Sequence, residues 1–431
     1  MQKQETAAPA PRDAHARGST WAQKLALIGP AFIAGAWQFG PGNLTSAVEA
    51  GSAHSYSLLW VIGLSTVLMI FFTDMSVRIG IAAPGTMIAT IKQTLGKPMG
   101  VLAGVSVFFI TLCFSVGNAA GSGLALSILF GGSPILWTAV CSIGVGFVLL
   151  MRNVYTAVER ILLVLVGTMA IGFIASAFMA SPDWGAGVAG MVPSFPAGSE
   201  LLIIALVGTN FSINAAFFTS YATRQRGIRA DQYRDATITD TIPGIVAPGI
   251  MTCLVIMVAA AVLGATGERV QTLAQLANVF EPLAGSAGAT IFIIGFFGAA
   301  FSSMLANATA GGTLFADGLR SGDGPDSDSD GETGSAFDSP RTKLLVASVL
   351  AFGLFVVAVV PGSRVQLIIL AQAMTVLVAP FLGAMLLLIA NNDLMGDLRN
   401  TWWQNLFGAI GFIAILMSSG LLIARLTGLT G

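Results

Sequence analysis

Apolar residues run along this chain in long, nearly continuous stretches rather than in the one-sided stripes of a water-soluble helix. A helix needs about 20 mostly apolar residues to cross the hydrocarbon core of a membrane. The stretches predict eleven such helices, separated by short polar turns. They lie near residues 24–50, 55–81, 100–130, 133–151, 157–181, 199–222, 242–266, 284–318, 342–361, 364–391 and 402–427.

The composition agrees with a lipid environment. Of the 431 residues, 55% are hydrophobic and 10% are charged, whereas soluble domains average about 25% charged residues. The formal net charge of -1 argues against a basic nucleic-acid binder. Cys113, Cys141 and Cys253 lie in apolar stretches without a CxxC pair, which argues against a disulfide framework or a zinc site. The lipid bilayer is therefore the expected partner, and no cofactor is expected.

The distribution of basic residues predicts the orientation. If the N-terminus lies in the cytoplasm, only Arg269, Arg364 and Arg425 of the 20 Lys and Arg residues fall outside the cell. Cytoplasmic loops of membrane proteins carry an excess of Lys and Arg. This asymmetry favours eleven spans with the C-terminus outside, in what we expect to be a prokaryotic inner membrane.

Two predicted spans are interrupted near their middle, and they divide the chain into comparable halves. The first contains Gln38-Phe39-Gly40-Pro41-Gly42-Asn43 and the sixth Gly208-Thr209-Asn210-Phe211-Ser212-Ile213-Asn214. Unwound backbone is tolerated at membrane depth only where it lines a cavity or is covered by protein. Broken helices at matching positions indicate an inverted-repeat transporter with its site at the breaks, although polar residues also join helices without binding anything.

The predicted organisation follows from these breaks. Residues 1–21 form a disordered cytoplasmic tail, 22–181 a first five-helix repeat, 199–391 a second repeat, and 402–427 an eleventh helix. An acidic segment, 321–339, is predicted to be a disordered linker within the second repeat.

The residues around the first break carry a family resemblance. Gly29-Pro30-Ala31-Phe32-Ile33-Ala34, Gly40-Pro41-Gly42-Asn43 and Glu49-Ala50-Gly51-Ser52 resemble the first helix of the Nramp divalent-metal transporters. Weaker similarity extends over nearly the whole chain beyond the tail. The resemblance implies a LeuT-type fold of two inverted five-helix repeats plus an eleventh helix, in an all-α integral membrane protein with helices one and six broken.

Most of the family's functional positions are changed here. By the resemblance, its metal-binding Asp falls on Gly40, its helix-six Met and His on Ser212 and Asn214, and its helix-ten Gln on Val378. The acidic residues of its third helix fall on Ser115 and Asn118. Only Asn43 of the first-helix motif is kept.

The remaining polar set lacks the ligands that Mn²⁺ and Fe²⁺ prefer. Thioether, imidazole and thiolate suit soft and borderline metals, while Mg²⁺ takes oxygen ligands and keeps several waters. No metal site is therefore assigned. The expected substrate-binding residues are neutral: Gln38, Gly40, Asn43, Asn118, Asn210, Ser212, Asn214 and Gln372.

Coupling and gating candidates are few. Asp74 and Arg78 stand four residues apart on one helix and form either a structural ion pair or a gate. Glu49 is either a cap or interhelical partner or a residue of the outer vestibule. The remaining candidates are Ser115 and the pair Ser302 and Ser303, which resembles the sodium site of other LeuT-type transporters and equally fits small-residue helix packing.

These observations favour a secondary transporter that moves a cation by alternating access. The site chemistry favours hydrated Mg²⁺, or an organic or neutral solute, over Mn²⁺ and Fe²⁺. A second reading is a non-transporting membrane sensor on the same scaffold, of which a plant ethylene-signalling protein is an example. An enzyme ranks third, because the chain shows no nucleophile–base pairing.

Overall fold

The computed structural model describes residues 27–264, 270, 272–280, 285–320 and 339–428. The predicted tail and nearly all of the predicted acidic linker lie outside these ranges. Each of the eleven predicted apolar segments is occupied by a helix or by a pair of consecutive helices. Eight helices in the described ranges are long and apolar enough to cross a membrane, and a bent pair adds a ninth.

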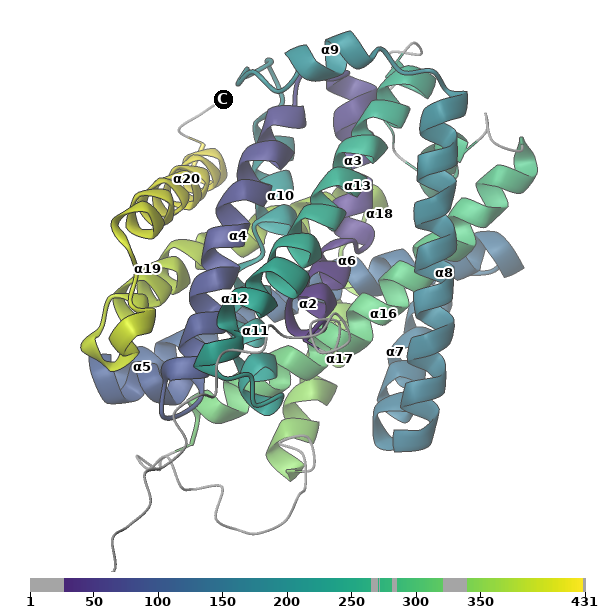
Figure 1. The fold of residues 1–431 in the computed structure, drawn as a ribbon. Coiled ribbons are helices and arrows are strands. Elements are labelled where there is room, and N and C mark those ends of the chain that lie inside the picture. The colour runs from purple at the N-terminus through teal and green to yellow at the C-terminus, as the bar shows by residue number, and fades with distance from the viewer. Residues whose placement is uncertain (1–26, 265–269, 271, 281–284, 321–338, 429–431) are drawn as a thin grey trace, which may run out of the picture.

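The first predicted repeat contains five of the predicted segments. The hydrophobic pattern did not predict two short helices, one within this repeat and one directly after it. The short helices are α5 and α9, which lie at opposite ends of the bundle (Figure 1). The helices are α2 (Pro30–Gln38), α3 (Pro41–His54), α4 (Leu59–Ala82), α5 (Met87–Leu95), α6 (Lys97–Phe130), α7 (Pro134–Leu150), α8 (Arg152–Met179) and α9 (Trp184–Ala189).

The second predicted repeat and the last helix follow the same outline, with short helical turns between the long elements. They are α10 (Glu200–Asn210), α11 (Ile213–Gln225), η1 (Ala230–Gln232), α12 (Tyr233–Ala236), η2 (Thr237–Thr241), α13 (Ile242–Val262), α14 (Leu273–Ala277), η4 (Asn278–Phe280), α16 (Ser286–Gly318), α17 (Pro340–Val359), α18 (Arg364–Met374), η6 (Thr375–Leu377), α19 (Ala379–Ala390), η7 (Asp393–Leu398) and α20 (Trp402–Leu426).

One interruption was not predicted. The tenth apolar segment is divided into α18 and α19, which are bent by 42°. The turn η6 lies between them, and Pro380 follows at the start of α19. A proline favours the first turn of a helix, where its missing N–H costs no hydrogen bond, so its position explains where α19 begins.

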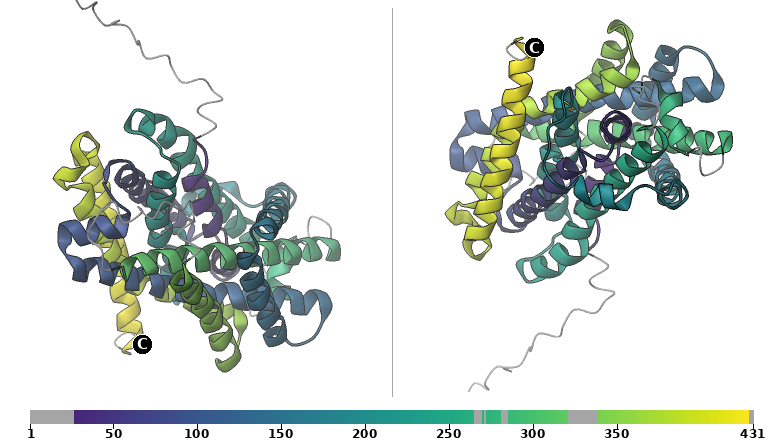
Figure 2. Two further views of the ribbon diagram at one scale, coloured as in Figure 1. Left: turned by 90° about the horizontal axis from the view of Figure 1, so that it is seen from below. Right: turned by 90° about the horizontal axis from the view of Figure 1, so that it is seen from above.

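The broken helices lie at the centre of the molecule. In Figure 1, α2, α3 and α10 lie between α20 on one side and α7 and α8 on the other, and the two views of Figure 2 agree. The outer helices carry apolar side chains on their surfaces, such as Ile143, which is 72% exposed, and Phe178, which is 75% exposed. Such exposure is unfavourable in water and is expected of side chains that face lipid.

Helix α2 packs unusually closely against α13. A Cβ atom built on Gly35 would lie 1.9 Å from the backbone oxygen of Gly244, and one on Gly244 would lie 2.7 Å from the backbone of Ala31. The two glycines therefore permit a backbone approach that a side chain would prevent. Asp240 of η2 strengthens this contact, because its carboxylate accepts backbone N–H groups of Gly29, Ala31 and Phe32 at the start of α2.

Candidate functional site

The first break lies between α2 and α3. Gln38 ends α2, and Phe39 and Gly40 leave the helical conformation before Pro41 begins α3. Gly40 has an extended backbone, with φ -90° and ψ -177°, and caps α3. The first backbone hydrogen bond of α3 joins Leu44 N to Gly40 O at 3.1 Å. The predicted interruption of the first span is therefore present, and Gly-Pro-Gly is the local cause.

The second break lies between α10 and α11. Asn210 ends α10, Phe211 and Ser212 are non-helical, and Ile213 begins α11. The hydroxyl of Ser212 donates to Oδ1 of Asn214 at 2.7 Å, a local bond that competes with helical pairing. The sixth span is thus broken without a proline.

A cavity of about 30 Å³ lies between the two breaks. It is also bounded by the middle of α6 and α16 and by the last turn of α18. Its lining includes seven of the eight expected substrate-binding residues, and it consists of polar side chains, two glycines, one alanine and one aromatic ring. The lining residues are Gln38, Gly40, Gly42, Asn43, Phe114, Asn118, Thr209, Ser212, Asn214, Ala215, Ser303, Asn307 and Gln372.

The wall of this cavity is electrically neutral. Among the lining residues there is no carboxylate, thiolate, thioether or imidazole. Elsewhere in the described part of the chain, no three His, Cys, Asp or Glu residues gather as metal ligands would. The fixed charges at the cavity are instead partial ones, because each break leaves the N-terminus of one half-helix and the C-terminus of another at the wall.

Four buried polar atoms of the lining have no hydrogen-bond partner in the structure. They are Nε2 of Gln38, Nδ2 of Asn43, Oγ of Ser303 and Oε1 of Gln372. Buried polar groups are nearly always paired, and an unpaired one costs about 1–3 kcal/mol. Their gathering around one cavity is what a site for a polar ligand or for water would show.

Asn210 does not belong to this wall, contrary to expectation. Its side-chain Nδ2 points to α4, where Ser65 Oγ lies at 2.8 Å and Thr66 Oγ1 at 2.9 Å. Asn210 is the last residue of α10, and its amide joins α10 to α4. The sequence could not distinguish these two directions at a break.

The serine candidates separate in the same way. Ser303 lines the cavity, whereas Ser302 is half-buried and donates to Ala299 O of its own helix at 3.2 Å. Ser115 lies away from the cavity and donates to Val349 O of α17 at 2.7 Å, which makes it a helix-joining residue. Only one of these three hydroxyls is therefore placed to meet a bound solute.

Glu49 lies at the α9 end of the bundle. Its Oε2 accepts a hydrogen bond from Val270 N at 3.0 Å. The same residue lines a cleft of about 700 Å³ together with His54 and Arg425. Glu49 thus joins α3 to the segment between α13 and α14 and also lines this cleft, so both interpretations of its role stay open.

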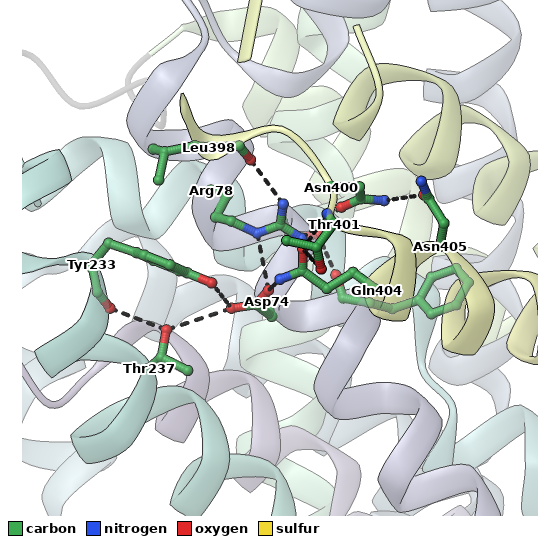
Figure 3. Close-up of polar contacts among 11 residues, drawn as sticks. Asp74, Arg78, Tyr233, Thr237, Leu398, Asn400, Thr401, Gln404 and Asn405 are labelled. Carbon is green, nitrogen blue, oxygen red and sulfur yellow. Dashed lines mark hydrogen bonds and ion pairs between the residues drawn. The ribbon is translucent and has the colours of Figure 1, made fainter. Parts of the chain in front are cut away.

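Asp74 and Arg78 form a buried ion pair within a larger polar network (Figure 3). Arg78 Nε lies 2.9 Å from Asp74 Oδ2, and its other nitrogens donate to Leu398 O and Asn400 Oδ1. Tyr233 donates to the other oxygen of Asp74 at 2.7 Å. The network joins α4 to α12 and to the segment before α20. None of these residues is among those that line the cavity, which favours the structural interpretation of the pair.

A second polar cluster joins α11 to α16 at the end of the bundle that carries α5. The hydroxyl of Tyr221 donates to the carboxylate of Asp317, and Thr86 Oγ1 donates to the same oxygen at 2.5 Å. Lys92 of α5 donates to Asp317 O at 2.6 Å. Both helices line the cavity with residues nearer their N-termini, so this cluster holds α11 and α16 together beyond the cavity, toward their C-terminal ends. We call Tyr221, Asp317 and Thr86 the α11–α16 clasp.

The sequence missed several lining residues. Asn307 was not among the expected residues, but it lines the cavity one helical turn after Ser303. Its Nδ2 also donates to Thr111 O at 2.9 Å. The four-residue spacing of Ser303 and Asn307 is the signal that could have found it. Gln372 of α18 lines the cavity, whereas Val378, where the resemblance placed the helix-ten Gln, packs in the apolar core.

An apolar helical bundle with two helices interrupted at a buried polar cavity is the architecture of inverted-repeat membrane transporters. The chain belongs to the natural resistance-associated macrophage protein-like family, Nramp, whose model matches residues 31–425. It is a multi-pass integral membrane protein, and the family resemblance predicted from the first helix is confirmed.

Individual relatives agree with this assignment over most of the chain. The divalent metal cation transporter MntH of Klebsiella pneumoniae (strain 342) is 24% identical over 413 residues, covering 94% of this chain and 95% of that protein. MntH of Granulibacter bethesdensis is 25% identical over 301 residues, covering 68% of each chain. These relatives are transporters rather than enzymes.

Solved structures confirm the predicted fold class. A variant of the Eremococcus coleocola manganese transporter has a TM-score of 0.77 at 17% identity, covering 95% of this chain and 88% of that one. Mhp1, a nucleobase-cation-symport-1 family transporter, has a TM-score of 0.54 at 15% identity, covering 92% and 93%. At these identities the likeness shows the fold alone.

Proposed function

We propose that this chain is a secondary-active transporter that moves a cation by alternating access through the cavity at the two breaks, and that its site is unsuited to Mn²⁺ and Fe²⁺. The family and its MntH relatives support transport of a cation. The neutral lining of the cavity carries the second half of the proposal. A dehydrated divalent ion is costly to bury without anionic or strongly dipolar ligands.

Hydrated Mg²⁺ is the divalent ion that best suits such a wall. Magnesium binds oxygen and keeps several of its waters, so amide and hydroxyl groups can meet its hydration shell rather than the ion. A cavity of about 30 Å³ holds roughly two waters at ~10–15 Å³ each. Transport of a hydrated ion therefore requires a state in which the half-helices lie further from α6 and α16.

A non-metal organic or neutral solute is the second candidate. The four unpartnered buried atoms favour it, because they offer a polar solute both donors and acceptors without any fixed charge. A solute of this class would gain hydrogen bonds at the wall without the dehydration cost of a divalent ion.

The basic residues support an orientation in which the α5 end faces the cytoplasm. Lys92 and Lys97 lie at that end, whereas Arg364 and Arg425 lie toward the end that carries α9. This arrangement agrees with the excess of Lys and Arg expected in cytoplasmic loops. We infer a cytoplasmic N-terminus in a prokaryotic inner membrane.

Uptake into proteoliposomes tests the proposal. Purified protein is reconstituted, and Mg²⁺ and Mn²⁺ uptake are measured with and without a pH gradient, against protein-free liposomes. We expect saturable Mg²⁺ uptake and little Mn²⁺ uptake. Strong proton-coupled Mn²⁺ uptake would contradict the argument from the lining, and stabilisation by a neutral solute without any cation flux would favour the second candidate.

Two neighbouring serines provide a matched pair of variants for the same assay. Ser303→Ala removes an unpartnered hydroxyl from the cavity wall, so the substrate concentration for half-maximal uptake should change. Ser302→Ala removes a hydroxyl that is bonded within its own helix and should leave uptake unaltered. Equal effects of the two substitutions would place the substrate elsewhere.

A further inference from the structure

The side chain of Asn43 lies between the cavity and α13. Asn43 and Thr252 are both fully buried, with 1% and 0% of their surfaces exposed. Thr252 Oγ1 lies 2.9 Å from Asn43 Oδ1 and 2.8 Å from the backbone oxygen of Pro248, one turn earlier in α13. The other end of the Asn43 amide, Nδ2, is buried at the cavity and has no partner.

The Thr252 hydroxyl faces two acceptor oxygens but has only one hydrogen to donate. A threonine hydroxyl carries one hydrogen, so it cannot donate both to Pro248 O and to an oxygen of Asn43. Bonding to the carbonyl four residues earlier is a common choice for a threonine in a helix. When the hydrogen goes to Pro248 O, Thr252 offers Asn43 only a lone pair, and two acceptors face each other.

A half-turn of the Asn43 amide resolves the conflict. The oxygen and nitrogen of an amide have nearly the same size, and their assignment rests on the hydrogen bonds that each orientation makes. In the turned orientation, Nδ2 donates to Thr252 and no longer lacks a partner. The amide oxygen then faces the cavity in place of the nitrogen.

We infer that Thr252 is a specificity-determining positioning residue: it orients the Asn43 amide so that the cavity presents a carbonyl oxygen to a cation. The inference rests on the proposed function, that this cavity binds a cation. Thr252 does not itself line the cavity, and it acts through Asn43. The opposite orientation would present an N–H₂ group, which repels a cation and attracts an acceptor.

Removal of the hydroxyl makes the oxygen-inward orientation costly. In Thr252→Val, either orientation leaves one end of the Asn43 amide buried against a methyl group. A buried N–H without an acceptor is less well tolerated than an under-satisfied carbonyl. Without a cation, the amide therefore turns its N–H₂ group to the cavity, where water can accept from it, and leaves its oxygen against the methyl group. Binding must then reverse that turn, which reduces the apparent affinity by the fraction of competent molecules. We expect about a tenfold rise in KM for the cation, equivalent to ~1.4 kcal/mol.

The experiment compares variants in proteoliposomes over a range of Mg²⁺ concentrations. Thr252→Val should raise KM about tenfold and change the maximal rate by less than about twofold, a split that general unfolding would not produce. Thr252→Ser restores the hydroxyl and should return KM to the wild-type value. Thr219→Val is the matched control, because Thr219 is also fully buried and bonds only to the carbonyl four residues earlier.

The same substitution in an Asn43→Asp background tests whether Thr252 acts through the orientation of the Asn43 amide. In Asn43→Asp the two side-chain oxygens are equivalent, so Thr252 has no orientation to set. Thr252→Val should therefore change KM by less than about twofold in that background, and the difference between backgrounds measures the coupling. An equal tenfold effect in both backgrounds would overturn the inference and indicate a purely structural role for Thr252.

The remaining outcomes separate this inference from the function on which it rests. Wild-type uptake of Mg²⁺ with an unchanged KM in Thr252→Val would overturn the inference and leave the proposed function standing. If the wild type neither takes up Mg²⁺ nor gains thermal stability from it, the inference and the proposed function are both contradicted. Thermal stabilisation by Mg²⁺ in detergent gives a second readout, in which Thr252→Val should need about tenfold more Mg²⁺ for the same shift.

Discussion

The substitution Gly40→Asp should give this site the divalent affinity that its neutral wall lacks. The backbone at Gly40 is extended, so a side chain is accommodated without strain in φ. The position caps α3, where aspartate is a preferred residue and gains a few tenths of a kcal/mol over glycine. The substitution is therefore expected to leave the fold intact while placing one negative charge at the cavity.

The expected gain follows from electrostatics. A carboxylate ~4 Å from a divalent ion at an effective dielectric constant of ~20 contributes roughly 8 kcal/mol of attraction. The loss of hydration by the ion and the carboxylate offsets most of this energy. If about 2 kcal/mol remain, the Kd for Mn²⁺ falls about 30-fold. Adding Ser212→Met introduces a thioether and should favour Mn²⁺ over Mg²⁺ further.

Isothermal titration calorimetry of the purified protein with MnCl₂ measures this change. Gly40→Asn is the matched control, because it has nearly the same shape and capping ability but no charge. The reasoning is refuted if Gly40→Asp, alone and with Ser212→Met, binds Mn²⁺ no more tightly than Gly40→Asn. That result would mean that the cavity between the breaks is not where the ion binds.

Three further predictions follow from the packing around the site. Tyr221→Phe breaks the α11–α16 clasp and should increase labelling, from the α5 end, of a cysteine introduced into the cavity wall by Ala215→Cys. Tyr233→Phe, which breaks a bond within the other network, should not increase it, and equal labelling would exclude a closing role. Arg78→Met leaves the buried Asp74 carboxylate without its cation and should lower the free energy of unfolding by about 3–5 kcal/mol. The thermal unfolding midpoint should fall while transport per folded molecule stays normal. Lost transport at an unchanged midpoint would indicate a gate instead. Gly35→Ala places a Cβ atom against a backbone oxygen of α13 and should lower the free energy of unfolding by about 1–3 kcal/mol. Gly167→Ala, where the added Cβ meets open space, should leave it unchanged. A stable Gly35→Ala protein would contradict the close packing.

The fold was largely readable from the sequence because a membrane imposes a simple length rule on apolar helices. Every predicted apolar segment holds a helix, and both predicted breaks are present. The bend between α18 and α19 was missed, because Pro380 alone does not distinguish a bent span from the first turn of a new helix. The short helices α5 and α9 were missed because hydrophobic length says nothing about helices that do not span the membrane.

The site was only partly predictable. A polar residue at a break could face the cavity or a neighbouring helix, and periodicity fails where the helix is interrupted. Ser212 and Asn214 face the cavity, but Asn210 bonds to α4. Within intact helices the spacing rule holds, and it would have joined Asn307 to Ser303.

The sequence by itself determined the membrane location, the two breaks and the absence of charge among the residues expected at the site, because these properties depend on residue type and order. Tertiary structure decided which polar atoms meet. Asn43 and Thr252 are 209 positions apart, and only the packing of α3 against α13 brings one hydroxyl between an amide and a backbone carbonyl. The direction of a side chain depends on partners that folding supplies from distant parts of the chain.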